Sequence, residues 1–474
     1  MDIFETIKSL DVKEIKKIFK RPTFAVDQEE AIAQYKVSGH DIFDTTKRPV
    51  KIIKKGTGEL NADGSEKTTS ATVEPARIGM SFQQLIVDRR VGFMLTIPVT
   101  TEAVFNTESE KEKALVKLVD RIQNDNKMDY LNKEIAERMM SEMECAEVWY
   151  FIETGEAKPK FTIRCNIWSP DKGDVLYPLF DVTGDMIAFA REYKLKENDK
   201  DIEHFDIYMP DFEYKYVNRD STWQLDILTD KTGKAKPNPI PNLVNKIMII
   251  YHSQLYPEWH NVQSQISRYE TSKSNHADMN DYFGSPILAV EGEVRGFAQK
   301  GEQGKIMELM EGSKAAYLAL ETEPESIKME QDGLKEDIYT LSQTPDISFK
   351  AMSGMGTIAQ FTMKAFFMDA HMAVSKKERI FGIGLQRRLN LIKAAIGTVI
   401  DTSLAKEANT VQLSPIITPY LPQNTTEDIE NLTVARTGGI LSTETAIEQN
   451  PLVENSEIEL KRMKEDKTAE LAEI

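Results

Sequence analysis

The chain has 474 residues, of which 41% are hydrophobic and 28% charged, a composition typical of a folded protein with about three domains. Its formal net charge of −17 argues against a general nucleic-acid-binding surface, because such surfaces are basic. The sequence has two cysteines without CxxC spacing, no signal-peptide pattern and no apolar run long enough to span a membrane. We therefore expect a soluble protein made in a reducing compartment.

The N-terminal third is expected to be mainly helical. Residues 1–47 predict two short amphipathic helices, because apolar side chains recur on one face at Ile3, Ile7, Leu10, Ile15 and Ile18. Glycine, asparagine and aspartate are concentrated in residues 55–73, which predicts a polar, mobile loop. Further helices are expected over residues 80–94 and 108–142.

From residue 147 the apolar period changes to two, which predicts strands. The segments that fit are 148–152, 161–168, 175–182, 186–195, 205–209, 213–217, 223–228 and 246–251. Short turns rich in glycine and aspartate separate several of them, so an antiparallel meander is expected.

A polar helix is predicted from about Pro257. It has a narrow seam of residues at three- and four-residue steps, namely Trp259, Val262, Ile266, Tyr269, Lys273 and His276. A strand-bearing insert follows at 285–321, and a second helix begins at a capping box and stops at Thr344-Pro345. Since both helices have abundant polar surface, we expect them to pack beside copies of themselves rather than to fill a globular core.

The next segment, residues 346–356, is expected to be a loop with two glycines, two methionines and Lys350. A long helix over 357–397 follows, and it has seven basic and two acidic residues, whereas residues 258–344 have sixteen acidic and eight basic ones. In the C-terminal tail, the sequence predicts an extended stretch at 412–420 and two helices. On this pattern alone the loop could be a simple connector, and the oppositely charged helices could simply pair between neighbouring copies.

Catalytic chemistry is not evident in the sequence. It has no GxxxxGK, HExxH or GxSxG motif. The six histidines are scattered, and His252 and His260 are spaced poorly for metal ligation. Carboxylate pairs such as Glu291 and Glu293 are better explained as solvated surface among 76 acidic residues. We therefore expect no catalytic residue, no metal and no cofactor, and hence a protein that is not an enzyme.

Short segments along nearly the whole chain follow one another in a characteristic order. They are Tyr35, Gly39, His40 and Ile42, then residues 78–99, 177–181, 188–193, 275–278, 282–286, 341–348, 440–445 and 451–453. As an ordered set they resemble the portal proteins, or head-to-tail connectors, of tailed double-stranded-DNA bacteriophages, in the group from long-tailed phages.

The resemblance implies an α+β fold with crown, wing, stem and clip regions that assembles as a ring around an axial channel. The implied regions are an N-terminal helical part of the wing (1–99), a strand-rich wing (100–256), a stem helix (257–284), a clip (285–321), a second stem helix (322–345), a tunnel loop (346–356), a long helix joining wing and crown (357–397), and a crown with the C-terminal tail (398–474).

The implied function is that of a virion component at one capsid vertex, assembled in the host cytoplasm as a ring of about twelve copies. Double-stranded DNA would be packaged and ejected through it without sequence preference. An acidic wall would let DNA slide, because few phosphates would find cationic partners. The implied partners are the terminase large subunit, a head-completion or adaptor protein, and the major capsid and scaffolding proteins, but no membrane. Another structural capsid or scaffold-type protein without a channel is the alternative, although it would not explain the order of helix, insert, helix, loop and helix.

The resemblance also implies site residues. The DNA channel would be formed by the tunnel-loop residues Ser348, Lys350, Met352, Ser353, Gly354, Met355 and Gly356, with Lys350 as a weak phosphate contact. The clip would bind the motor and then the adaptor through Glu302, Gln303 and Glu308. The six seam residues are expected to pack between stem helices.

Overall fold

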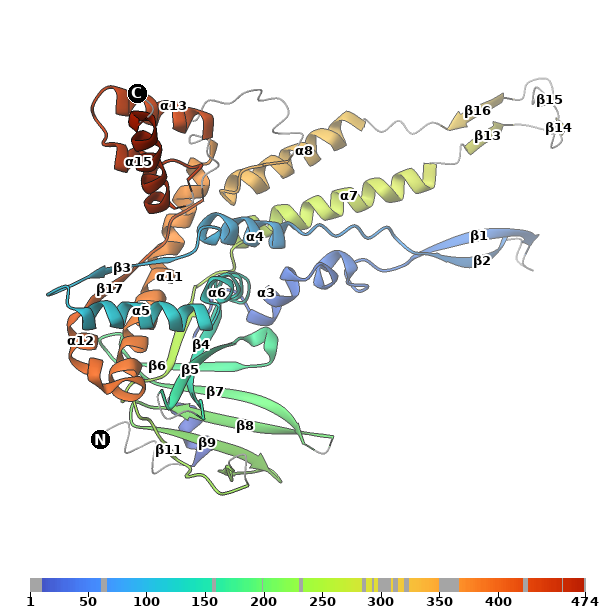
Figure 1. The fold of residues 1–474 in the computed structure, drawn as a ribbon. Coiled ribbons are helices and arrows are strands. Elements are labelled where there is room, and N and C mark those ends of the chain that lie inside the picture. The colour runs from blue at the N-terminus through green and yellow to red at the C-terminus, as the bar shows by residue number, and fades with distance from the viewer. Residues whose placement is uncertain are drawn as a thin grey trace.

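The computed structural model describes residues 11–60, 66–155, 159–197, 199–229, 233–283, 287–291, 294–296, 308–309, 314–318, 324–348, 366–420, 425–453 and 455–472. Helices and strands are both abundant in these residues, which confirms the predicted α+β class. Figure 1 shows a body of helices and sheets from which a long arm, formed by α7 and α8, extends to one side.

The first part of the chain contains α2 (Val12–Ile18), α3 (Gln28–Tyr35) and α4 (Phe82–Leu95). Helix α3 begins where the side chain of Asp27 accepts hydrogen bonds from the first backbone N–H groups of the helix. The polar loop predicted at 55–73 is wrong for the described residues, which form an antiparallel ribbon of β1 (Lys51–Leu60) and β2 (Glu66–Val73). Threonine and valine in β2 favour a strand, and this β-branched signal was outweighed by the glycines.

The single helix predicted over 108–142 is two helices, α5 (Glu110–Asp125) and α6 (Met128–Glu142). A capping box between Ser109 and Glu112 begins α5. The break lies at Lys127, whose φ of 53° is left-handed. The side-chain amide of the preceding Asn126 donates to the carbonyl oxygens of Ile122 and Ile163, so a tertiary contact fixes the break.

The predicted meander is confirmed for five strands. They are β6 (Val175–Phe180), β7 (Met186–Glu197), β8 (Lys200–Tyr208), β9 (Phe212–Arg219) and β10 (Thr222–Leu225), and the short β11 (Ile240–Pro241) also pairs with β9. The remaining predicted strands form a separate sheet of β4 (Glu144–Glu153), β5 (Phe161–Trp168) and β12 (Ile249–Ser253). Strand β3 (Thr100–Val104) pairs with β17 (Gln412–Ile416), which joins distant parts of the sequence.

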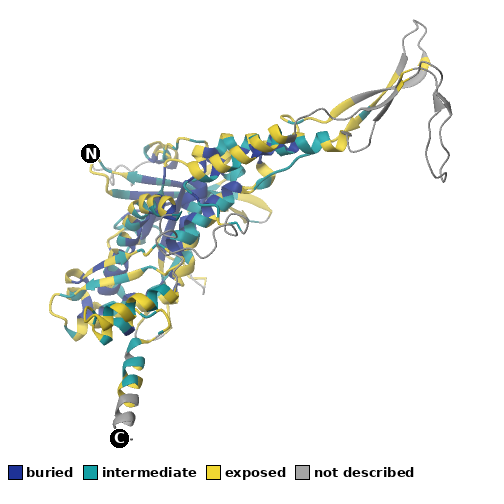
Figure 2. Ribbon diagram, turned by 90° about the horizontal axis from the view of Figure 1, so that it is seen from above, coloured by how far each residue is buried: buried dark blue, intermediate teal, exposed yellow. Residues whose placement is uncertain are grey.

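The main core lies between the β4–β5–β12 sheet and the helices α4, α5, α6 and α11 (Met368–Ala395). Helix α11 continues as a π-helical turn (Ile396–Ile400) and is followed by α12 (Ala405–Thr410). The C-terminal helices are α13 (Thr425–Thr437), α14 (Thr443–Glu448) and α15 (Ser456–Ala472). Figure 2 shows that burial is concentrated in the body, whereas the arm is largely exposed.

The arm consists of α7 (Gln263–Phe283) and α8 (Pro324–Leu341). Beyond them lie the two-stranded pairs of β13 (Ile287–Glu291) with β16 (Lys314–Leu318), and of β14 (Val294–Gly296) with β15 (Glu308–Leu309). The expected order of helix, strand-bearing insert and helix is therefore present in the described residues.

The expectation that the whole seam packs between copies is wrong for its first four members. Trp259, Val262 and Ile266 are 0% exposed and Tyr269 is 6% exposed within one chain. Trp259 stacks on Tyr35, and Tyr269 packs edge-on against Phe82. The start of α7 is therefore part of the body core, because the N-terminal helices supply partners that the periodicity of α7 alone cannot reveal.

Candidate functional site

Helix α7 is held along two opposite faces, which fixes the direction of the arm. On one face it packs beside α8, where Arg268 and Ser272 contact the carboxylate of Glu330. The hydrogen bonds from Arg268 and Ser272 lower the pKa of Glu330. At 100° per residue, Glu270, Ser274 and Asp278 lie on the opposite side of the helix and face the segment that contains β1 and the start of α4.

Asp278 is the main anchor on that second face. Its carboxylate lies 2.8 Å from both Arg48 and Lys51, and it also accepts the backbone N–H of Ala76 at 2.6 Å. Burial alone would raise the pKa of Asp278, but these three partners lower it. The root of the β1–β2 ribbon is thereby tied to the arm.

About two turns closer to the body, Glu270 accepts the backbone N–H of Met80 at 2.7 Å and pairs with His40 at 2.6 Å. Both side chains of this pair are 3% exposed. Nε2 of His40 donates to the carbonyl oxygen of Gln34 at 2.8 Å, so a doubly protonated ring satisfies both contacts. Burial lowers the pKa of His40, but the hydrogen bond and the charge of Glu270, together with the Gln34 carbonyl and Asp41, outweigh burial and the net shift is upward.

The C-terminal end of α8 is fixed by two charged side chains from α4. After Gln343, whose φ of 54° is left-handed, the backbone N–H of Thr344 donates to the carbonyl oxygen of Tyr339 at 2.9 Å. Arg90 of α4 donates to the carbonyl oxygen of Ser342 at 2.7 Å. The neighbouring Arg89 donates to the carbonyl oxygen of Pro345.

Arg90 belongs to a buried ion-pair network that we call the α8 clamp, defined as Arg90, Glu258 and Lys377. Glu258 lies just before α7 and contacts Arg90 at 3.0 Å and Lys377 of α11 at 2.6 Å. Arg90 and Glu258 have only 4% and 6% of their side chains exposed. Burial lowers the pKa of Arg90 although Glu258 opposes the shift. Four elements (α4, α7, α8 and α11) therefore meet where α8 ends.

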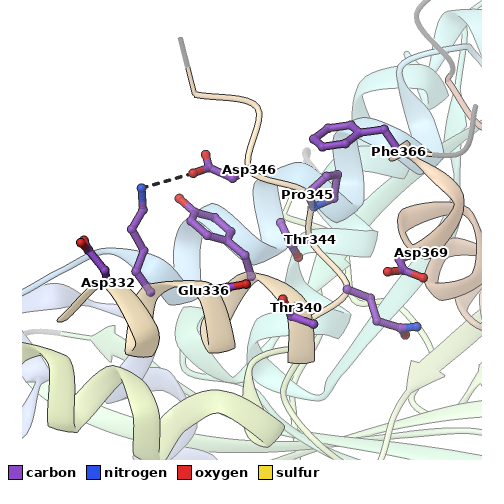
Figure 3. A pocket seen from close by; sticks show the side chains of 11 residues that line it. Asp332, Glu336, Thr340, Thr344, Pro345, Asp346, Phe366 and Asp369 are labelled. Carbon is purple, nitrogen blue, oxygen red and sulfur yellow. Dashed lines mark hydrogen bonds and ion pairs between the residues drawn. The ribbon is translucent and has the colours of Figure 1, made fainter. Parts of the chain in front are cut away.

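Beside the end of α8 lies a cavity of about 430 Å³. It is lined by Asp332, Lys335, Glu336, Tyr339, Thr340, Gln343, Thr344, Pro345, Asp346, Phe366 and Asp369. Figure 3 shows the ion pair between Lys335 and Asp346, at 3.2 Å, on one side of this cavity. Burial would raise the pKa of Asp346, but the Ser348 N–H and Lys335 lower it. The cavity thus adjoins both ends of the stretch 349–365.

Few of the predicted channel and clip residues lie in the described part of the chain. Ser348 does, and its N–H donates to Asp346 at 3.0 Å. Glu308 lies in β15, which pairs with β14. The predicted residues outside the described part are Lys350, Met352, Ser353, Gly354, Met355, Gly356, Glu302 and Gln303. Of the seam, Lys273 and His276 lie farther out on α7 and are half-buried, and the Lys273 ammonium lies 5.3 Å from the Tyr269 ring centroid.

Sequence reasoning missed the α8 clamp and a second buried network around Arg388. Arg388 was counted among the basic residues of a helix that could pair between copies, but it pairs with Glu147 of its own chain at 2.6 Å. Lys393 is also turned inward, and donates to the carbonyl oxygen of Val411 at 2.8 Å. The adjacent Arg89 and Arg90 within an apolar helix were the available signal for the clamp, because a buried arginine requires an acceptor.

Two features of the described residues bear on other functions. No group of three or more His, Cys, Asp and Glu side chains there could hold a metal ion. None of the helices in the same residues is both long and apolar enough to cross a membrane.

Comparison with known proteins establishes the family. The model for "Phage portal protein, SPP1 Gp6-like" matches residues 27–472, which is nearly the whole chain. The chain belongs to this portal protein family. The portal protein of Bacillus phage SPP1 is 21% identical over 407 residues, covering 82% of this chain and 76% of that protein. A chain from a structure titled as the neck of an empty GTA particle gives a TM-score of 0.43 at 9% identity, covering 77% of this chain and 87% of the other.

The prediction of a phage portal protein is therefore confirmed, and with it a portal or connector function. Family membership also makes this portal protein a virion component. A structural rather than enzymatic role fits the family.

Proposed function

We propose that this portal protein forms a closed ring of about twelve copies at one capsid vertex, with the α7–α8 arms side by side around an axial channel for double-stranded DNA. The observation that carries the proposal is the arm itself, which is anchored at its root by Asp278, Glu270 and the α8 clamp while its outer half stays exposed. A long exposed helical pair with a fixed direction is suited to packing in an assembly.

Ring formation is tested with the purified protein. Native mass spectrometry and particle images at high concentration, with and without scaffolding and major capsid proteins, are expected to show closed rings with a central hole. Compact monomers under all these conditions would contradict the proposal.

The tunnel loop 346–356 would form the constriction of the channel. Its beginning is fixed to α8 by Asp346, which contacts Lys335 and the N–H of Ser348. In a ring, Lys350 would place one weak, salt-screened phosphate contact per copy against a wall rich in carboxylates. The loop would therefore steady the duplex without arresting it.

Lys350→Ala is expected to leave the ring intact and to change the packaging rate or the retention of packaged DNA. A matched control is Lys117→Ala on the exposed side of α5. Unchanged packaging and retention in Lys350→Ala, with the ring intact, would remove Lys350 from the channel.

The strand pairs at the far end of the arm would form the clip, which would bind the terminase large subunit first and a head-completion protein later. Joint replacement of Glu302, Gln303 and Glu308 by alanine is expected to weaken terminase binding while ring assembly survives. The control is the pair Lys117→Ala and Asp129→Ala on the body. Normal packaging and adaptor binding by the triple variant would place the partner site elsewhere.

The energy for DNA movement would come from the motor and not from this chain, which we propose has no catalytic activity and needs no metal. The purified ring is then expected to hydrolyse no ATP and to cleave no DNA. Either activity, if abolished by a substitution in this chain, would contradict this part of the proposal.

A further inference from the structure

Strands β3 and β17 form a small sheet of their own in the described part of the chain. Figure 1 shows them side by side at the margin of the body. A two-stranded sheet has two outer edges, and an unprotected edge presents backbone N–H and carbonyl groups to which another chain can pair. The two edges of this sheet differ in how they are protected.

The outer edge of β17 is covered by α11. The carbonyl oxygen of Leu413 accepts a hydrogen bond from the side chain of Gln386 at 2.8 Å, and that of Val411 accepts from Lys393 at 2.8 Å. Pro415, the next residue with the same orientation, has no N–H to donate, and proline in a strand is found where the N–H would be unpaired. This edge therefore offers little to an added strand.

The outer edge of β3 has no such protection. In the register of the sheet, Ala103 lies opposite Leu413 and Thr101 lies opposite Pro415. Two opposite residues in an antiparallel pair either bond to each other or both turn their backbone groups outward, so Thr101 and Ala103 point away from β17. Within the described residues, the N–H and carbonyl groups of Thr101 and Ala103 form no hydrogen bond. They are therefore free to pair with an extended chain.

A cavity of about 560 Å³ adjoins this edge, between the start of β3 and the corner where α5 meets α6. Thr100 and Thr101, whose side chains lie on opposite faces of the sheet, both line it, whereas no residue of β17 does. The cavity therefore lies on the side of β3 that is turned away from β17. The side-chain amide of Gln123 on α5 donates to the hydroxyl of Thr101 at 3.3 Å, which fixes the edge beside the cavity.

The lining of this cavity suits a positively charged side chain. It has two carboxylates, Asp120 and Asp129, and one ammonium group, Lys127. Asp120 has no ion pair within the described residues, and burial raises its pKa. Tyr130 is 73% exposed and lines the same cavity, and the face of its ring can hold a cation. The exposed Glu102 adds a further carboxylate on β3 itself.

We infer that the open edge of β3 binds an extended segment of a partner protein as an added strand, and that the cavity takes a lysine or arginine side chain of this segment. The inference goes beyond the proposed ring and does not depend on it, because the edge belongs to a single chain. Pairing of β3 with β3 of a second copy would create a twofold axis, whereas a ring needs contacts between different surfaces. The expected occupant is therefore another protein.

The first experiment tests recognition of backbone and charge with synthetic peptides. The probe is a short fluorescent peptide of alternating threonine and valine with one central arginine. One comparison peptide has glutamate at the centre, and the other has N-methyl groups on alternate backbone nitrogens. Fluorescence anisotropy with the purified protein should show that the arginine peptide binds about tenfold or more tighter than either comparison peptide. Equal binding of the three peptides, or binding of none, would overturn the inference.

Two variants locate the site. Ala103→Pro removes one outward N–H and keeps the pairing of β3 with β17, and Asp120→Asn removes one carboxylate from the cavity. Each should weaken binding of the arginine peptide by about fivefold or more. The control is Asp337→Asn at an exposed carboxylate of α8, which should bind like wild type. If Ala103→Pro does not fold, the N-methylated peptide tests the same backbone contact. Unchanged binding in either folded variant would contradict the inference.

Hydrogen exchange shows whether the edge is free before the peptide is added. The amides of Thr101 and Ala103 should exchange fast in the purified monomer and in the ring, and should become protected when the arginine peptide binds. Protection in the ring without peptide would show that a neighbouring copy covers the edge, and would rule out another protein as its occupant. Protection only at other sites would place the peptide elsewhere and would also overturn the inference. Absence of rings would reject the proposed function and leave this inference standing.

Discussion

Arg388 is 1% exposed, and its Nε and Nη2 donate to the carboxylate of Glu147 at 2.8 and 2.6 Å. The same carboxylate contacts His252 at 2.7 Å. Burial would raise the pKa of Glu147, but Arg388 and His252 lower it to about 2. This network joins α11 to β4 and β12, so α11 is positioned by charge as well as by apolar packing.

Arg388→Met is expected to lower the free energy of unfolding by about 3–5 kcal/mol at pH 7, because it leaves a buried carboxylate without its main cation. Urea denaturation of the monomer measures this. The folded-state pKa of Glu147 lies below the ordinary 4.5, so its contribution is present above pH 4.5 and lost as the pH falls towards 2. The difference in free energy of unfolding between Arg388→Met and wild type should therefore become smaller as the pH is lowered. Arg387→Met, at the exposed neighbouring position, is the control and should change little.

His40 gives a pH dependence of the opposite sign. Its folded-state pKa is raised above 6.5 through Glu270, with a further contribution from Asp41. The stabilisation from protonated His40 is thus fully present below pH 6.5 and lost as the pH rises through the folded-state pKa. Between pH 6 and pH 9 the stability advantage of wild type over His40→Gln should shrink, as measured by urea denaturation. His260→Gln, at an exposed histidine, should show no such trend.

Among the structural elements, the α8 clamp determines how the arm meets the body. Glu258→Ala would leave Arg90 buried without its carboxylate and would also remove the partner of Lys377. We expect backbone amides of residues 340–348 to exchange hydrogen about tenfold faster or more, because the end of α8 opens at lower cost. Hydrogen exchange with mass spectrometry measures this.

The matched control for the clamp is Glu330→Ala, which breaks the exposed pair with Arg268 on the same arm. Exposed pairs contribute less than about 1 kcal/mol, so exchange in residues 340–348 should stay near the wild-type rate. If hydrogen exchange in residues 340–348 were accelerated equally in both variants, the α8 clamp would not be what holds the end of α8.

Elements with a strong local pattern were predictable from the sequence, and elements defined by distant partners were not. The capping box and Pro345 indicated where α8 begins and ends, and the apolar period of two indicated the positions of most strands of the meander. The division between α5 and α6 depends on a bond from Asn126 to Ile163, which local periodicity cannot reveal. For the same reason the clamp was missed, since its three residues are far apart in sequence.

The anchoring of the arm has a mechanical consequence. A force on the far strand pairs acts on α7 and α8 as on a lever, whose fulcrum is the set of ion pairs at Asp278, Glu270 and Glu258. Because these carboxylates hold three different parts of the body, a torque at the tip is divided between the N-terminal segment, α4 and α11. In the proposed closed ring, work done on the tips by a motor would reach the body of each copy through these charged contacts and through the apolar packing at the start of α7.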